Sequence, residues 1–418
     1  MIFSSSINAQ DEPYSFTFAP DLWYNDVDGI RTGIRVFGEV EGSFKDGPHR
    51  LDAGLWLGTW FPDNPVSYYL SFTEPIEAIS DFGNEGNIQI LSSIRTGYSQ
   101  HKIQLNKRWQ SGFDEYDYLE FNTSISSEKL IDDEYRPFPS VWQDEAKTLV
   151  GTQFLLSRKL HSGQFIAFLD FKTNLNKESG RFSVGTLEIT HRFDLSERFK
   201  FRIRGFAGLA TDNVAPEHRF LTSMASPQNW LSKGVSRAKG TIAQPWLEAG
   251  SFHVGGGANL RGYLNRDINS LNTANQDGAQ YFFPIYKSIF AFNTEIEFPN
   301  PLNNSIKTIA VIEDLTELRT YLFADFGKGS DYTLIEDPDA VVLPQIVPPF
   351  IGGASDNPNL IADAGIGLQL SINIPDYLGK DRGFFIRYDI PFWLSDPEAG
   401  ESNFSFRQLV GLGAIISF

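Results

Sequence analysis

The segment from residue 404 to residue 418 decides the fold, and it reads FSFRQLVGLGAIISF. Alternate residues of an extended chain share a face. One face is almost wholly apolar: Phe404, Phe406, Gln408, Val410, Leu412, Ala414, Ile416 and Phe418. The other is mostly small or polar: Ser405, Arg407, Leu409, Gly411, Gly413, Ile415 and Ser417. The pattern predicts one strand of about fifteen residues, whereas strands of globular proteins usually have about five or six.

The same alternation recurs along the chain. It is clearest in the segments 30–37, 199–204, 290–298, 360–374 and 384–393. In each of them one face is apolar and the opposite face carries charged or small residues. A water-soluble protein would have to cover these apolar faces with a second sheet or with helices, and no amphipathic helix of sufficient length is evident in the sequence.

A transmembrane antiparallel β-barrel accounts for both faces, because its exterior meets lipid and its lumen is polar. Strands of about ten residues or more suit a tilted membrane crossing, and closure leaves no unpaired edge in lipid. We predict sixteen crossings, near 30–40, 50–60, 66–74, 88–98, 102–109, 116–124, 148–157, 164–174, 182–193, 198–208, 241–254, 288–298, 318–327, 360–374, 383–393 and 404–418. Residues 1–29 would be a leader or residual N-terminal segment, and residues 30–418 the barrel.

Composition narrows the functional classes. The 418 residues carry a net charge of −17, which argues against a nucleic-acid partner. The absence of cysteine excludes a disulfide scaffold and a thiolate metal site. No HExxH or GxSxG motif occurs, and the six histidines lack metal-ligand spacing. We therefore expect no enzyme, no metal and no cofactor. No run of about 18 apolar residues suggests a transmembrane helix.

A set of short motifs follows in order along the second half of the chain. The loop segment 255–263 reads GGGANLRGY, which by itself is equally well explained as a flexible turn. Later strands carry Glu295 and Glu297, then Phe323, Asp325 and Gly327 on one face, then Gly365 and Gly367, and the chain ends at Phe418. This set resembles the barrel of the outer-membrane insertase and two-partner secretion superfamily, also called the bacterial surface antigen family. The resemblance covers roughly residues 30–418.

The resemblance implies roles for these residues. The (L/V)RG(F/Y) tetrad of the family, matched by Leu260, Arg261, Gly262 and Tyr263, lies at the tip of a sixth surface loop that folds into the lumen. A partly desolvated arginine needs a partner, so Arg261–Asp325 is the expected pair, with Glu295 or Glu297 as a second acceptor. Gly262 would allow a tight turn and Tyr263 would pack against the wall.

The remaining residues of the set have expected roles as well. Gly365 and Gly367 would clear space for the loop tip. Gly411 and Gly413 would lie at the seam between segments 30–40 and 404–418, and Phe418 would be the barrel-assembly signal. The alternative for the arginine pair is that it only locks the shape of the barrel.

The resemblance places the chain in the bacterial outer membrane, in contact with lipid and lipopolysaccharide. It implies assistance in the insertion or translocation of client polypeptides, with a separate periplasmic or surface subunit as a further candidate partner. We expect none of the polypeptide-transport-associated domains of the family. Residues 21–29 resemble the start of the barrel in peptidase-fused members, although a polar turn explains them too. A porin-like or passive anchoring barrel is the alternative function.

Overall fold

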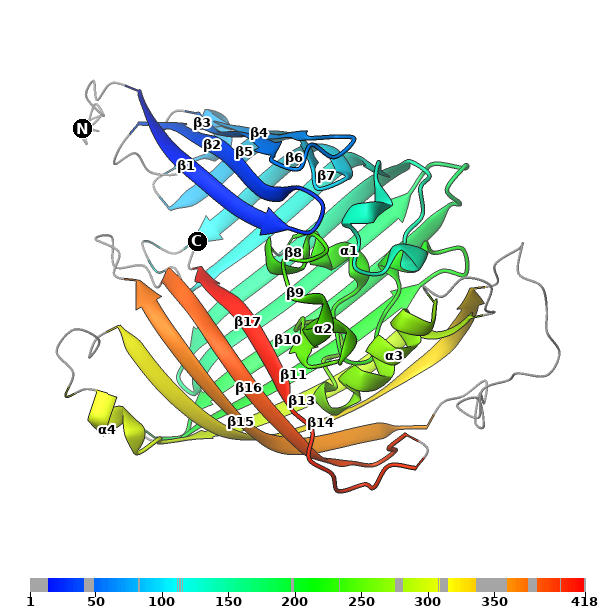
Figure 1. The fold of residues 1–418 in the computed structure, drawn as a ribbon. Helices are drawn as coiled ribbons and strands as arrows, with labels where there is room; N and C mark the ends of the chain where they lie inside the picture. The colour runs from blue at the N-terminus through cyan, green and yellow to red at the C-terminus, as the bar shows by residue number, and fades with distance from the viewer. Residues whose placement is uncertain are drawn as a thin grey trace, which may run out of the picture.

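The computed structural model describes the chain from residue 14 to residue 416. Within these limits it leaves out residues 41–48, 82, 111, 113, 115, 197–198, 233, 275–280, 307, 309–314, 336–358, 375–381 and 399. The described part is almost entirely β-structure, in one sheet that curls into a barrel (Figure 1). No helix in these described ranges is long and apolar enough to cross a membrane.

Sixteen strands of eight residues or more form the wall in the described part of the chain. They are β1 (Ser15–Asn25), β2 (Gly29–Glu39), β3 (Arg50–Gly58), β4 (Val66–Pro75), β5 (Asn84–Arg95), β6 (Tyr98–Gln110), β7 (Tyr118–Leu130), β8 (Lys147–Leu160), β9 (Gly163–Asn174), β10 (Phe182–Asp194), β11 (Lys200–Ala210), β13 (Tyr281–Phe298), β14 (Thr316–Ile335), β15 (Ile361–Ile374), β16 (Arg382–Leu394) and β17 (Leu409–Ile416). Each strand of the wall pairs antiparallel with the next.

The short elements lie in the connections between strands. They are the two-residue β12 (Phe252–His253), the helices α1 (Pro227–Trp230), α2 (Gln244–Glu248), α3 (Leu264–Ala274) and α4 (Leu302–Ile306), and the 3-10 turns η1 (Glu77–Ile79), η2 (Asp133–Tyr135), η3 (Pro139–Val141), η4 (Pro216–His218), η5 (Gly234–Ser236) and η6 (Arg261–Tyr263). Most of them belong to the connection between β11 and β13.

The observed wall differs from the prediction at one missed strand, at one predicted crossing that is absent, and at the last strand. The segment 404–418 predicts one strand of about fifteen residues, whereas β17 begins only at Leu409, after an isolated bridge at Phe404. The first strand, β1, lies within residues 1–29, so the boundary we placed at residue 30 falls one strand too late. Its polar residues and Pro20 weaken the alternation, and proline is tolerated in a strand mainly at a sheet edge. Conversely, the predicted crossing at 241–254 contains α2 and β12 instead. The predicted number of sixteen therefore results from one strand missed and one added.

The two faces of the strands separate as the alternation predicts. Large apolar side chains point outward along the wall, among them Leu22 at 69% exposure, Ile103 at 50% and Leu412 at 45%. Charged and small residues point inward, including Asp325 and Asp389, each 1% exposed. In the segment 360–374, Asp363, Gly365, Gly367 and Ser371 are buried, as expected for the lumen face.

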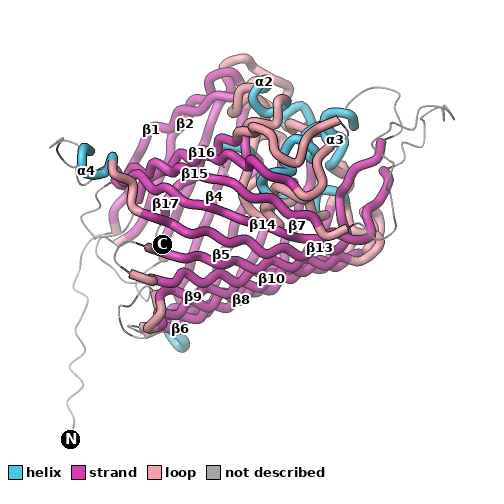
Figure 2. The backbone as a smooth tube through the Cα atoms, turned by 90° about the horizontal axis from the view of Figure 1, so that it is seen from below, coloured by secondary structure: helices cyan, strands magenta, loops and turns pink. Residues whose placement is uncertain are grey.

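The connection between β11 and β13 fills the lumen. Counted from β1, it is the sixth connection at its end of the barrel, and its helices α1, α2 and α3 lie inside the wall in Figure 1 and toward one end in Figure 2. We call residues 211–280 the sixth loop. Its apolar side chains form a buried cluster with residues from the β7–β8 connection and from the ends of β6, β7, β13 and β17: Tyr98, Leu130, Phe138, Val141, Trp142, Leu221, Met224, Ala225, Trp230, Ile242, Leu247, Phe252, Val254, Leu264, Ile268, Leu271, Ile285 and Leu409.

The first and last strands are not joined by a ladder in the described residues. β1 pairs with β2 only. β17 pairs with β16 on one edge, and on the other with β12, in a short parallel ladder in which Val410 N donates to Ser251 O over 2.7 Å. The expected seam between segments 30–40 and 404–418 is therefore wrong in its first member, because the strand at the N-terminal edge is β1. Figure 1 shows β1 in blue and β17 in red on the side facing the viewer.

Candidate functional site

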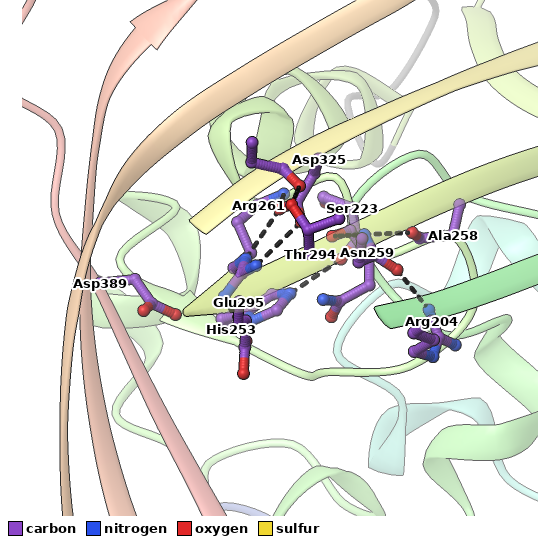
Figure 3. A network of polar contacts seen from close by, with 12 residues as sticks. Arg204, Ser223, His253, Ala258, Asn259, Arg261, Thr294, Glu295, Asp325 and Asp389 are labelled. Atoms are coloured by element: carbon purple, nitrogen blue, oxygen red, sulfur yellow. Dashed lines mark hydrogen bonds and ion pairs between the residues drawn. The ribbon is translucent and has the colours of Figure 1, made fainter. Parts of the chain in front are cut away.

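Arg261 lies at the start of η6 and is completely buried. Its guanidinium binds Asp325 of β14 with two parallel hydrogen bonds, from Nε to Oδ2 over 2.7 Å and from Nη2 to Oδ1 over 2.8 Å (Figure 3). This fork geometry is the one that arginine offers to a carboxylate. The structure therefore brings together the two residues that the sequence paired.

Strand β14 supplies both the acceptor and a ring for the arginine. Phe323 and Asp325 are two residues apart, so both point into the lumen. The Arg261 guanidinium carbon lies 3.8 Å from the centre of the Phe323 ring, within the range of a cation–π contact. The charge is thus held by a carboxylate at its edge and an aromatic ring on its face. Gly327, two residues further on, is also buried and lies close to Phe290 O.

Glu295 of β13 links this pair to the neighbouring wall. Its Oε1 accepts from Arg261 Nη1 over 2.8 Å and from Arg387 Nη2 over 2.6 Å. Its Oε2 lies 3.5 Å from Arg202 Nη1 on β11. Glu297, the other predicted acceptor, does not contact Arg261 and instead lies 3.8 Å from Arg319 Nε.

Three residues that we did not single out extend the network along β14 and β16. Arg387 Nε lies 2.7 Å from Asp389 Oδ2, and Tyr321 Oη donates to Asp389 Oδ1 over 2.6 Å. Arg387 also lies over the Tyr321 ring, at 4.8 Å from its centre. The signal for them is present in the sequence, because Arg387 and Asp389 share the polar face of the predicted strand 383–393.

Gly262 acts through close approach, and the expected tight turn is not the reason for a glycine. Its φ is not among the positive values found in the described residues. A Cβ at this position would overlap Leu394 and lie against Asp363. The loop tip can therefore press its backbone onto the wall at β15 and β16. Tyr263 packs beside it as expected, 1% exposed, and its hydroxyl donates to Ala362 O over 3.0 Å.

Gly365 and Gly367 clear space, but for side chains of the wall, where we expected the loop tip. A Cβ at Gly365 would overlap the Phe323 ring, and one at Gly367 would overlap the Tyr321 ring and Asp389 Oδ1. The two aromatic rings of β14 can therefore lie flat across β15 and reach under the guanidinium groups. Leu260 is fully buried in an apolar cluster with Tyr263 and Ile289.

The backbone of the loop before the tip is also fixed to the wall. Arg204 Nη2 donates to Gly257 O over 2.7 Å, and Asn293 Nδ2 donates to Asn259 O over 3.1 Å. Arg204 in turn binds Asn293 Oδ1 and Glu188 Oε2, each over 2.7 Å. Polar residues of β10, β11 and β13 thus hold the segment whose arginine is bound by β13 and β14.

The predicted seam residues lie on β17. Gly411 pairs with Arg387 of β16 and with His253 of β12, and Gly413 pairs with Phe385. Phe418, the expected assembly signal, lies outside the described residues. In the described ranges no group of three or more His, Cys, Asp or Glu is arranged to hold a metal ion. The site is a network of buried ion pairs that fixes an inserted loop to four neighbouring strands.

Comparison with known proteins gives similar structures only. No family model and no curated protein matches the chain. BamA from Haemophilus ducreyi lacking POTRA domains 1–3 is similar at 10% identity and a TM-score of 0.47, over 96% of this chain and 71% of that chain. CdiB from Escherichia coli is 8% identical with a TM-score of 0.44, over 96% of this chain and 62% of that chain. CdiB from Acinetobacter baumannii is 12% identical with a TM-score of 0.38, and the chain spans 60% of its length.

Proposed function

We propose that this chain is a barrel of the bacterial outer membrane that assists the insertion or translocation of polypeptides. The outward apolar belt and the polar lumen support a location in lipid, where such a wall buries its apolar side chains. The insertase-type motifs from Leu260 to Asp325 occupy one connected network, which supports the resemblance seen in the sequence. Lipid and lipopolysaccharide would surround the wall, and client polypeptides would be the transient partners.

The arrangement of the two edge strands carries the proposal. In the described residues no strand pairs with the outer edge of β1, although Tyr24 O near its end accepts from Thr241 Oγ1, and β17 offers the part of its edge beyond β12. A free edge presents a row of backbone donors and acceptors that can pair with another strand. In hydrocarbon these groups have no water to bind, so a client strand that satisfied them would be strongly favoured. An insertase needs such an edge, whereas a passive anchor does not.

Site-specific photo-crosslinking tests the use of this edge. A photo-reactive phenylalanine analogue at Thr17, on β1, should trap outer-membrane polypeptides in cells. The same analogue at Thr190, on β10, is the matched control, because that strand is paired on both edges. Equal trapping at both positions, or none at Thr17, would contradict the proposal and favour a porin-like or anchoring barrel.

Substitution of Arg261 distinguishes a role in polypeptide insertion from a role in holding the shape of the barrel. Arg261→Ala should reduce both the level of other outer-membrane proteins and the thermal stability of the barrel, since it leaves Asp325 buried without its partner. If barrel stability falls while the other outer-membrane proteins keep their level, the pair only locks the barrel. A separate periplasmic or surface subunit would be recovered with the client polypeptides in the photo-crosslinking experiment at Thr17.

A further inference from the structure

A second group of arginines lies in the lumen at the end of the barrel that carries the sixth loop. Arg31 is at the start of β2, Arg95 is the last residue of β5, and Arg237 belongs to the sixth loop. Arg31 is only 5% exposed. The Arg31 guanidinium lies 4.7 Å from the Trp56 ring centre, and that of Arg95 lies 4.5 Å from the Tyr69 ring centre.

None of these arginines forms an ion pair with a carboxylate that the structure describes, although Asp28 and Asp21 lie near Arg31 and Asp52 lies near Arg95. The Nε atoms of all three are buried and make no hydrogen bond with a described residue. The nearby carboxylates are already engaged. Asp28 accepts from Asn25 and from the Tyr135 hydroxyl, and Asp52 pairs with Arg35 at 3.3 Å. This contrasts with Arg261, whose charge is matched by Asp325 and Glu295.

The positive charges of these arginines repel one another. Burial, followed by the charges of Arg95, Arg31 and Arg136, lowers the pKa of Arg237 to about 9. Arg237 therefore remains protonated at neutral pH, close to other cations and without an ion pair to a described carboxylate. An anion that entered between these groups would relieve the repulsion and supply the missing acceptors.

A cavity opens beside this cluster. Its volume is about 570 Å³, and its lining includes Tyr69, Arg95 and Arg237. The lining also includes the amides of Gln100, Gln153 and Gln228. It further includes Lys172 and two carboxylates, Asp170 and Glu188, which pair with Lys172 and Arg204. Ligand pockets usually have volumes of about 300–1,000 Å³. Guanidinium groups match the oxygens of a phosphate, whereas neutral amides suit hydroxyl groups, which both donate and accept hydrogen bonds.

We propose that this cavity binds a small organic phosphate with a hydroxylated body. The phosphate would lie between Arg95 and Arg237, with Arg31 behind them, and the body would extend toward the glutamine side chains. The site belongs to the lumen wall of β2–β9 and the middle of the sixth loop, so it does not depend on a role in polypeptide insertion.

Calorimetric titration of the purified full chain in detergent tests this site. Glucose 6-phosphate is the probe, inorganic phosphate tests the phosphate alone, and glucose tests the body alone. We expect saturable binding of glucose 6-phosphate, weaker binding of inorganic phosphate and none of glucose. Arg95→Gln and Arg237→Gln should each weaken glucose 6-phosphate binding roughly tenfold, which is the usual effect of losing one charged hydrogen bond.

Arg158→Gln is the matched control. It removes the same charge at the end of β8 that leads into β9, where Arg158 pairs with Asp117. The affinity for glucose 6-phosphate should stay within about twofold. The site is refuted if glucose 6-phosphate does not bind, or if Arg158→Gln weakens binding as much as Arg237→Gln. Inorganic phosphate binding as tightly as glucose 6-phosphate would overturn the assignment of the hydroxylated body. Arg237 lies in a loop, so its variant remains informative if Arg95→Gln fails to fold.

Discussion

Asp363 lies directly opposite Asp325 in the ladder between β14 and β15, and both carboxyl groups are buried. Arg261 binds Asp325 with a bidentate pair, whereas the Asp363 carboxyl forms no ion pair with a described residue and lies beside Asp325 and the Gly262 backbone. Two acidic residues thus share one guanidinium, and only one of them is satisfied. The two positions should respond differently to the loss of their charge.

We predict that Asp325→Asn lowers the free energy of unfolding by about 3–5 kcal/mol, because it leaves Arg261 buried with one partner fewer. Asp363→Asn should leave the stability unchanged or raise it, since it removes a like charge from beside Asp325. Urea titration in detergent, followed by tryptophan fluorescence, measures both. A charge exchange, Arg261→Asp with Asp325→Arg, should recover part of the loss if the contact itself matters. Equal losses in the two asparagine variants would contradict this assignment.

Asp267 of α3 provides a pH-dependent contribution within the sixth loop. Its Oδ2 accepts from Ser223 N over 2.7 Å and from Ser223 Oγ over 2.6 Å, whereas its Oδ1 has no partner among the described residues. Burial raises the pKa of this carboxyl from 3.8 to about 6, and the Ser223 hydrogen bonds oppose that rise. Between these two values the folded chain holds a proton that the unfolded chain has released, so stability falls as the pH rises.

We predict that Asp267→Asn removes this loss, which amounts to about 3 kcal/mol for a pKa difference of this size. The variant should therefore gain stability over the wild type at pH 8 and little at pH 4. Thermal unfolding at the two pH values measures the difference. The exposed Asp194→Asn serves as control and should shift both values alike. A gain for Asp267→Asn that is the same at both pH values would show that the carboxyl is not protonated in the folded state.

At the scale of the element, the glycines of β15 set how closely the side chains of β14 can lie. We predict that Gly367→Ala lowers the free energy of unfolding by about 1–3 kcal/mol, because its methyl group would displace the Tyr321 ring and Asp389. Gly205→Ala, in β11, is the matched control, since a Cβ there meets nothing within 4 Å. The melting temperatures of the two variants in detergent, each compared with the wild type, measure these changes. A similar change in both would mean that the ring moves freely and that the glycine is not required.

The strands show which sequence signals are reliable. Alternation identified β13 to β17 and their inward residues, because a wall with lipid on one face and charge on the other repeats with a period of two. The same signal misled at 241–254, where a short extended stretch covers the edge of β17. It also missed β1, whose apolar face of Phe16, Phe18 and Leu22 is interrupted by Pro20. The alternation of apolar and polar residues does not by itself distinguish a strand of the wall from a short strand inside the barrel.

For the whole molecule, the Arg261–Asp325 pair could be predicted because a buried arginine needs a carboxylate on a facing strand. The roles of Gly365 and Gly367 could not, since they depend on how far the Phe323 and Tyr321 rings reach across the ladder. The cluster of Arg31, Arg95 and Arg237 was equally hidden. Its members are separated by more than sixty residues at each step, and only the curvature of the sheet and the insertion of the loop bring them together.

The sixth loop occupies the lumen while the strands that surround it come from both sides of it in the sequence. About seventy residues separate β11 from β13, and because these strands pair antiparallel, the loop starts and ends at the same end of the barrel. We expect the last five strands to pack around the loop as they pair, because its apolar side chains are buried together with Ile285 of β13 and Leu409 of β17. Biogenesis then has an order: strands β1 to β11 form a trough, the loop packs into it, and β13 to β17 pair around the loop. A chain that stopped before β13 to β17 had paired would leave the apolar side chains of the sixth loop exposed to proteases.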